Sequence, residues 1–176
     1  ANNPVLIEDE TLTDLSFLGL PSLRDANEND KISLLATQFI GNPADGSNPA
    51  NGVWGVTAPL PDIGVLLPSE VQEIQTLLAT ANGAIASSVP DGWALFDLHG
   101  LYNEVVTTGV FEDDFNMTGD LVFGGFFSLD GFNPTSRGSA LIAKRMLAAI
   151  DATYGSNLSE AGLDIGDYPT NYPEGI

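Results

Sequence analysis

The sequence predicts a single α/β domain with parallel strands, on the evidence of its composition and the order of its elements. Apolar runs typical of strands alternate with helical patterns in the order strand, long loop, helix, strand, loop, helix. Hydrophobic residues make up 43% of the 176 residues and charged residues 16%, which is enough for one ordinary core. In a parallel α/β fold, the loops at the carboxyl ends of the strands form the functional site.

The N-terminal part is expected to hold a buried strand and a long loop. The apolar run ISLLATQF, residues 32–39, fits a strand that is buried in a sheet. The segment from about 41 to 64 is dense in Gly, Pro and Asn, which predicts a long surface loop. Long loops inside compact domains are often functional, so this loop is a candidate binding region.

A helix is expected to follow Pro68, with Ser69 as its N-cap and Glu70 in its first turn. Apolar residues then recur at helical spacing, at Val71, Ile74, Leu77, Leu78, Ala81 and Ile85. The turn PDGW leads to a short apolar strand at 94–98, and a helix or edge segment is expected after it.

The last helix is predicted to open at Pro134–Ser136 and to end at Tyr154-Gly155, a natural C-cap. Its apolar face carries Leu141, Ile142, Met146, Leu147 and Ile150. We therefore expect the domain to span residues 1–155. The acidic segment that follows, residues 156–176, is expected to lie extended on the surface or to be mobile.

The charge of the chain excludes several classes of function. Against 24 Asp and Glu stand 5 Lys and Arg, a formal net charge of -19 that repels nucleic acids and anionic lipids. No apolar stretch has the length of a membrane span, so we expect no membrane insertion by this chain. The absence of cysteine excludes disulfides, thiolate metal sites and a cysteine nucleophile. The excess of carboxylates suits a saline or cation-rich setting.

Two local patterns are candidate sites. His99, the only histidine, follows the predicted strand at the end where α/β sites form, and it is either a replacement base or ligand or a structural histidine. The stretch DFNMTGD places Asp114, Asn116 and Asp120 at the spacing that begins a calcium loop. Its twelfth position is Gly125 and not the bidentate Glu of such loops. This stretch is either a calcium site or a polar turn, and no other cofactor is expected.

The stretch SLDGFNPTSRGSALIAKRMLAAIDATYG resembles the last conserved block of the SGNH (GDSL-type) hydrolases. In that block an Asp, and a His three residues later, precede Pro-Thr and the final helix. The resemblance extends back through NPVLIEDETLTDL, ISLLATQFIG, GVTAPLPDIGVLLPSEVQEIQ and ALFDLHGLYNEV. These segments are similar to the C-terminal half of secreted or surface-anchored bacterial members. The resemblance implies a three-layer α/β/α fold with a parallel sheet and a Ser-His-Asp ester hydrolase mechanism.

The sequence departs from the family at the catalytic positions. Asp130 takes the aspartate position, and Asn133 stands where the family carries the His. A carboxamide cannot accept a proton near neutral pH, so Asn133 cannot be the general base. The nucleophile block of the family, Gly-Asp-Ser, and its Gly-x-Asn-Asp block have no counterpart in this sequence. The resemblance places both blocks upstream of Ala1. Asp130 is therefore either a relic of the triad or a cap for the turn and the helix after it.

Three functions follow, and whether the chain is an enzyme stays open. The first is a degenerate SGNH-like domain, inactive by itself, with a structural or binding role in an extracellular or bacterial cell-surface assembly. The second is the C-terminal part of a nicked or split ester hydrolase whose Ser lies on another chain. The third is a carbohydrate- or cation-binding module that uses the loop around Trp54. Since two predicted strands make a marginal sheet, the rest should come from another protein chain or from the missing N-terminal half of the same protein.

Overall fold

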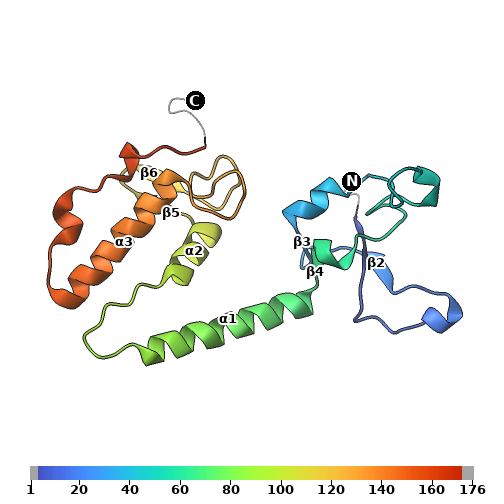
Figure 1. Cartoon of the computed structure of the whole chain (residues 1–176), viewed down its shortest axis with the longest axis horizontal. Helices are drawn as coiled ribbons and strands as arrows, with labels where there is room; N and C mark the ends of the chain where they lie inside the picture. The colour runs from blue at the N-terminus through green and yellow to red at the C-terminus, as the bar shows by residue number, and fades with distance from the viewer. Residues whose placement is uncertain (1–3, 172–176) are drawn as a thin grey trace. The chain divides into compact units, whose positions relative to one another are not determined.

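The computed structural model of the chain describes residues 4–171 and divides into two compact units (Figure 1). Unit 1 ends at Ala84 and unit 2 begins at Ile85, so the division falls inside helix α1 (Pro68–Ser88). The sequence placed its only boundary at residue 155 instead. Among the described residues, no helix is long and apolar enough to cross a membrane.

The chain has mixed α/β content, with helices and small antiparallel sheets. Three two-stranded sheets pair β1 (Leu6–Glu8) with β2 (Leu23–Asp25), β3 (Lys31–Ile32) with β4 (Val65–Leu66), and β5 (Val110–Glu112) with β6 (Phe115–Met117). Within residues 4–171, parallel pairing is confined to isolated bridges: Ile7–Leu60, Trp54–Ala58 and Thr118–Gly125. Residues 4–171 thus form small antiparallel ribbons and no three-layer parallel arrangement.

The core of unit 1 is small and is assembled from short elements. Its buried apolar side chains come from β1, β4, the segment between these strands and the residue after β4: Ile7, Ala36, Leu60, Val65 and Leu67. The strand predicted at 32–39 is wrong, because β3 covers only its first residue and a 3-10 helix follows (Leu34–Gln38). The Ser33 hydroxyl accepts a hydrogen bond from the Ala36 N–H at 3.2 Å, and this cap starts the helical turn.

A buried ionic cluster supplements that core. The guanidinium of Arg24 in β2 binds both oxygens of Asp30, at 2.7 and 2.6 Å, and its Nε donates to Asp9 after β1. Asp9 and Asp30 are both buried. The Thr11 hydroxyl together with Arg24 lowers the pKa of Asp9, and Arg24 lowers the pKa of Asp30. The cluster therefore ties β1, β2 and the following loop together through charged hydrogen bonds.

Helix α1 confirms the helix predicted after Pro68, but its cap differs. The helix begins at Pro68, and the N–H of Leu67 donates to Glu70 Oε2 at 2.7 Å. This is the glutamate half of a capping box, so the prediction of Ser69 as N-cap is wrong. Every residue of α1 is described, and none is buried.

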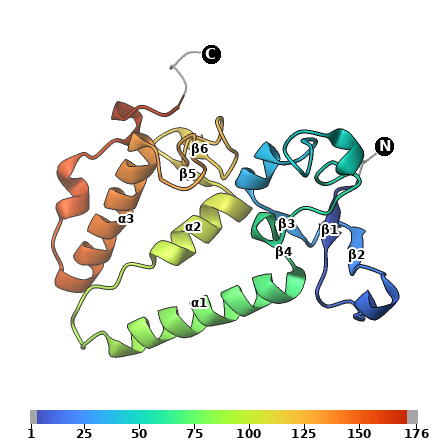
Figure 2. The same cartoon turned by 45° about the vertical axis from the view of Figure 1, so that its right-hand side comes forward.

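The core of unit 2 is larger and joins helices to a hairpin. It packs α2 (Leu98–Thr107) and α3 (Ser136–Tyr154) with the β5–β6 hairpin, which lies beside α3 in Figures 1 and 2. Its buried side chains are Leu101, Val105, Val110, Met117, Phe126, Ala140, Leu141 and Ile165. The strand predicted at 94–98 is wrong: Asp97 caps α2 by accepting the Gly100 N–H at 2.8 Å, so a helix starts there instead.

The final helix and the segment after it pack as one piece. Helix α3 is confirmed with its predicted C-cap, Gly155, in the left-handed conformation. Residues 156–171 do not lie extended on the surface, because they form two 3-10 helices (Leu158–Ala161 and Ile165–Asp167) and Ile165 is completely buried. The Arg137 guanidinium stacks on Phe115 at 3.9 Å and donates to the carbonyls of Ile165 and Tyr168 at 3.3 and 3.1 Å. Residues 172–176 of the predicted tail lie outside the described residues.

Candidate functional site

The loop from 126 to 135 in unit 2 holds the two positions that the sequence singled out for catalysis. Two backbone hydrogen bonds close it, from the Ser128 N–H to the Asn133 carbonyl and from the Thr135 N–H to the Phe126 carbonyl, both at 2.8 Å. The loop therefore returns on itself before α3 begins. Residues 130 and 133 lie at its exposed end.

The Asp130 carboxylate organises this end of the loop. Its Oδ1 accepts the Ser128 hydroxyl at 2.6 Å and the N–H groups of Phe132 and Asn133 at 2.8 and 2.9 Å. Its Oδ2 accepts the Asn133 side-chain amide at 2.7 Å. Bonds from the Ser128 hydroxyl, the Phe132 N–H and Asn133 hold the pKa of the Asp130 carboxyl well below its usual range.

This geometry separates the two structural tasks expected of Asp130. It does cap the turn, because its Oδ1 accepts two backbone N–H groups of that turn. It does not cap the helix, because the cap of α3 is Thr135, whose hydroxyl accepts the Gly138 N–H at 3.0 Å. The same hydroxyl donates to the carbonyl of Gly125 at 2.7 Å and fixes the loop to the helix.

The arrangement lacks a proton acceptor for nucleophilic catalysis. The Ser128 hydroxyl faces a carboxylate that stays ionised well below neutral pH, and such a carboxylate is a poor base at pH 7. The Asn133 amide donates to that carboxylate, as the imidazole of a triad does, but an amide nitrogen takes up no proton. The side chains of Ser128, Asp130 and Asn133 can stabilise the conformation of the loop and form hydrogen bonds with a ligand.

His99 lies elsewhere in unit 2, in the first turn of α2 and not at a strand end. Its ring is exposed, and the side-chain amide of Asn103, one helical turn later, lies 3.3 Å from it. No hydrogen bond within residues 4–171 joins its ring to the Asp130 loop. Its role as a base stays a prediction.

The predicted calcium residues lie in the β5–β6 hairpin and just after it. Asp114 sits in the hairpin turn with φ 67°, Asn116 lies in β6 with an exposed side chain, and Asp120 accepts the Thr118 hydroxyl at 2.9 Å. The neighbouring Asp113 binds Lys144 at 2.5 Å and the Ile165 N–H at 3.0 Å. In the part of the chain that the structure describes, no three His, Cys, Asp or Glu residues gather as a metal site.

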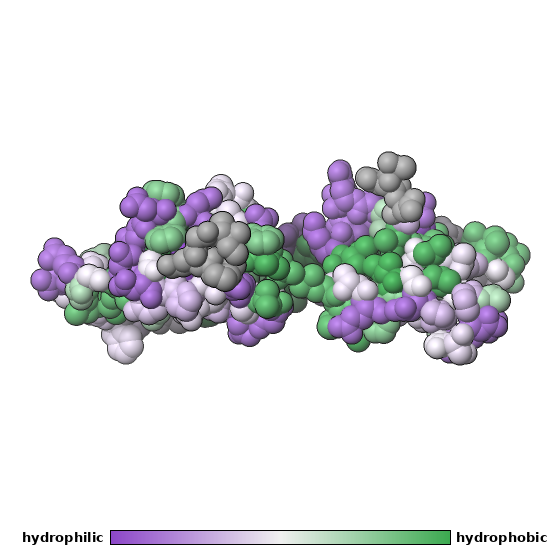
Figure 3. All heavy atoms as spheres, turned by 90° about the horizontal axis from the view of Figure 1, so that it is seen from above, coloured by the Kyte–Doolittle hydropathy of each residue, from purple (hydrophilic) through white to green (hydrophobic). Residues whose placement is uncertain are grey.

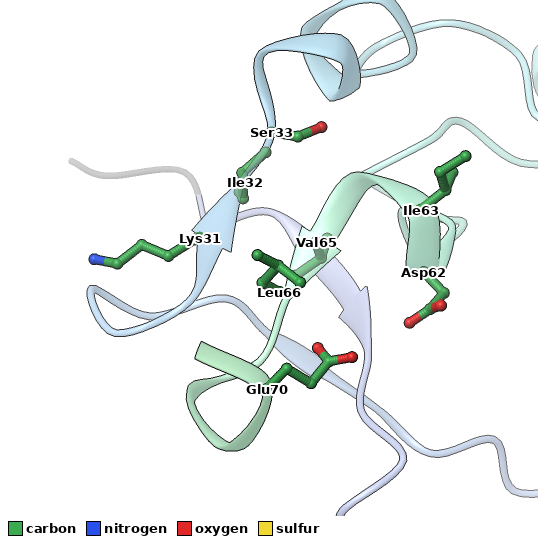
Figure 4. A pocket seen from close by; sticks show the side chains of 8 residues that line it. All are labelled: Lys31, Ile32, Ser33, Asp62, Ile63, Val65, Leu66 and Glu70. Carbon is green, nitrogen blue, oxygen red and sulfur yellow. The ribbon is translucent and has the colours of Figure 1, made fainter. Parts of the chain in front are cut away.

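A hollow of about 290 Å³ in unit 1 had no signal in the sequence (Figure 4). It is lined by Lys31, Ile32, Ser33, Asp62, Ile63, Val65, Leu66 and Glu70. Figure 4 shows the Lys31 side chain extending away from the carboxylates of Asp62 and Glu70. Because Glu70 already caps α1, the hollow offers an apolar floor with the Asp62 carboxylate, which has no hydrogen-bond partner among residues 4–171, at its rim.

Unit 2 contains a second hollow of about 330 Å³ between α2 and α3. Its walls are Leu95, Phe96, Asp97, Gly100, Leu101, Glu104, Arg145 and Ala149. Arg145 pairs with Glu112 at 3.2 Å, and its buried Nε has no hydrogen-bond partner among the described residues. The hollow presents charges of both signs, and its two walls come from segments that are distant in the sequence, 95–104 and 145–149.

Trp54, the residue proposed for sugar stacking, packs partly against the core of unit 1. A backbone bridge to Ala58 and a hydrogen bond from its N–H to the Asn42 carbonyl at 3.0 Å hold it in the loop. Much of its ring area is therefore engaged in packing and not offered as a platform.

Comparisons with protein-family models, curated proteins and solved structures find no match for this chain. The resemblance to SGNH hydrolases accordingly rests on the residues from 128 to 155 and the shorter segments before them.

Proposed function

We propose that this chain is a degenerate SGNH/GDSL hydrolase-like domain without hydrolase activity of its own. Its role is structural or binding, in an extracellular or cell-surface assembly. The observation that carries the proposal is the bond from the Asn133 amide to Asp130 at 2.7 Å. The loop keeps Asp130 paired with residue 133, as a triad pairs its acid with its base. The amide of Asn133 cannot accept a proton, so the pair cannot act as a base.

Exposed apolar side chains support a binding role. Ile63 in unit 1 is 81% exposed, and Phe132 in unit 2 is 77% exposed beside Asp130. Figure 3 shows apolar surface between polar patches on both parts of the chain. Contiguous apolar surface on a protein in water marks contact with a partner. The partner is another protein chain or an N-terminal half of the same protein, and it supplies the strands of a three-layer parallel sheet.

A split ester hydrolase is the second candidate, favoured by the same bond. The turn places the side chain of residue 133 against the acid, where an imidazole would be oriented for catalysis. In this alternative another chain contributes both the Ser nucleophile and the base. The two candidates differ in whether a complex of this chain hydrolyses esters.

Inactivity of the chain is tested with a fluorophosphonate probe and a short-chain p-nitrophenyl ester on the 176-residue protein. We expect no labelled serine and no hydrolysis above buffer, because no base activates a hydroxyl. Labelling of any serine of this chain overturns the proposal. Ester hydrolysis that appears only in a complex with a Ser-bearing chain selects the split hydrolase.

The relation of the loop to a triad is tested with Asn133→His. We expect the introduced imidazole to bind Asp130 and to titrate about one pKa unit or more above the usual value near 6.5. Combining it with Asp130→Asn is the matched control, which should return the pKa toward the usual value. NMR titration of the imidazole protons measures both. Equal pKa values in the two variants would mean that the loop does not hold a triad-like pair.

A further inference from the structure

Helix α1 carries an apolar seam with a seven-residue repeat. Val71, Leu78 and Ile85 are spaced by seven, and Ile74 and Ala81 continue the alternation of three and four between them. An apolar residue every 3.5 residues on average forms a narrow stripe that packs against one other helix. A helix that packs on a broad core follows a repeat of 3.6 residues instead. The pattern is that of a helix paired along its length.

Among the described residues, little covers this seam. Ile74 is 43% exposed, Leu78 45% and Ile85 57%, and Leu77 beside them is 61% exposed. A helix of about 30 Å is only marginally stable in water unless its apolar face is buried. We propose that α1 pairs in antiparallel orientation with α1 of a second copy of this chain, and that this pairing is a binding surface of the protein.

The distribution of charge argues for a second copy. At a net charge of -19, two copies repel each other over most of their surface. Between Ile74 and Pro90 there is no charged residue, so this segment is where two acidic copies can approach without repulsion. Glu70 and Glu73 stand in the first two turns. Antiparallel pairing places them at opposite ends, while parallel pairing would set them side by side.

The residues of the seam complement themselves in that orientation. With Leu78 opposite Ala81 of the second copy, Ile74 lies opposite Ile85, and a large side chain meets a small one at the centre. The flanking Gln75 and Asn82 are uncharged and able to hydrogen-bond across the seam. The same patch meets itself about a two-fold axis, which is the commonest symmetry of soluble dimers.

This inference rests on the proposed binding role but on no part of the SGNH resemblance. A serine labelled by fluorophosphonate would overturn the proposed function and leave the pairing of α1 untouched. Conversely, a monomeric chain would overturn the pairing and leave the assignment of the Asp130 loop as it stands.

Sedimentation equilibrium of the 176-residue protein measures the pairing directly. We expect a monomer–dimer equilibrium in which Leu78→Glu raises the dissociation constant at least about tenfold, because it buries an unpaired charge in the seam. Thr76→Glu adds the same charge on the opposite side of α1 and should leave the constant unchanged. A protein that is monomeric at all concentrations, or equal effects of the two variants, overturns the proposal.

The register is tested by cross-linking, since the chain has no cysteine of its own. Leu78→Cys and Ala81→Cys are made as separate variants and oxidised alone and as an equal mixture. Antiparallel pairing predicts disulfide dimers that form mainly in the mixture. Efficient dimers of Leu78→Cys alone would mean parallel pairing, and no cross-link in any sample would mean that the seam binds something else; either result overturns the proposal.

Discussion

The two units of the chain stabilise themselves in different ways. Unit 2 has an apolar core in which Tyr102, Phe126 and Phe127 meet edge to face at centroid distances of 5.1, 5.7 and 4.9 Å. Unit 1 has a smaller core and adds the buried cluster of Arg24, Asp9 and Asp30. Because short strands and turns bury little apolar surface, charged hydrogen bonds supply part of the stability of unit 1. The units should therefore respond differently to the same kinds of change.

The largest effect is expected from Phe126→Ala in unit 2. This side chain is completely buried between Tyr102 and Phe127, so truncation leaves a cavity and should cost about 3–5 kcal/mol. Hydrogen exchange should show unit 2 opening while protection in unit 1 is kept. The control, Phe123→Ala, removes a ring that is 76% exposed and should cost under about 0.5 kcal/mol. Equal loss of protection in both units would contradict the division into separate cores.

Arg24→Met should be the most damaging single change in unit 1. It leaves Asp9 and Asp30 buried without their counter-charge, and breaking such a pair costs about 3 kcal/mol. Lys31→Met removes a cation from an exposed position of the same unit and should change stability by less than about 0.5 kcal/mol. Urea unfolding followed by the fluorescence of Trp54, in a Trp93→Phe background, reports on unit 1. A small effect of Arg24→Met would mean that the apolar core alone suffices there.

The acid response of unit 1 sharpens the same contrast. Asp9 and Asp30 have lowered pKa values when folded, so their contribution is complete above the unfolded pKa of about 3.9 and is lost as the pH falls further. In Arg24→Met the two carboxylates are desolvated and unpaired, which raises their pKa. That variant should therefore gain stability as the pH falls from 7. Urea midpoints at several pH values measure how the stability of the unchanged protein and of Arg24→Met depends on pH. The same dependence in both proteins would contradict a stabilising role for the charged cluster.

The helices were predictable because their signals are local. Apolar spacing and caps such as Gly155 lie within a few residues of one another. The two predicted strands were wrong for a related reason. Ser33 and Asp97 each accept an N–H three residues later, and this local bond starts a helical turn where an apolar run alone suggested a strand. The order of sheets depends on contacts distant in sequence, which a single sequence does not reveal.

The candidate site was predictable to a similar extent. A carboxylate followed by Gly and an Asn-Pro step predicts a capped turn, and Asp130 forms one. The cluster of Arg24 joins residues from three segments and has no periodic pattern. One signal was available, since 24 acids against 5 Lys and Arg favour a carboxylate partner for an Arg by number alone, and Arg24 has two. The hollows are products of packing and have no motif.

The smallest expected loss of stability comes from Thr135, and it tests whether the Asp130 turn is independent of the core of unit 2. Thr135→Ala removes the N-cap of α3 and the bond to the Gly125 carbonyl, and should cost unit 2 about 1–2 kcal/mol. Thr135→Ser keeps the hydroxyl and should recover most of that loss. The amide signals of Phe132 and Asn133 should stay where they are, since Asp130 holds its turn through bonds of its own. If those signals move with Thr135→Ala, the turn depends on the helix cap, and the loop and the core of unit 2 form a single cooperative element.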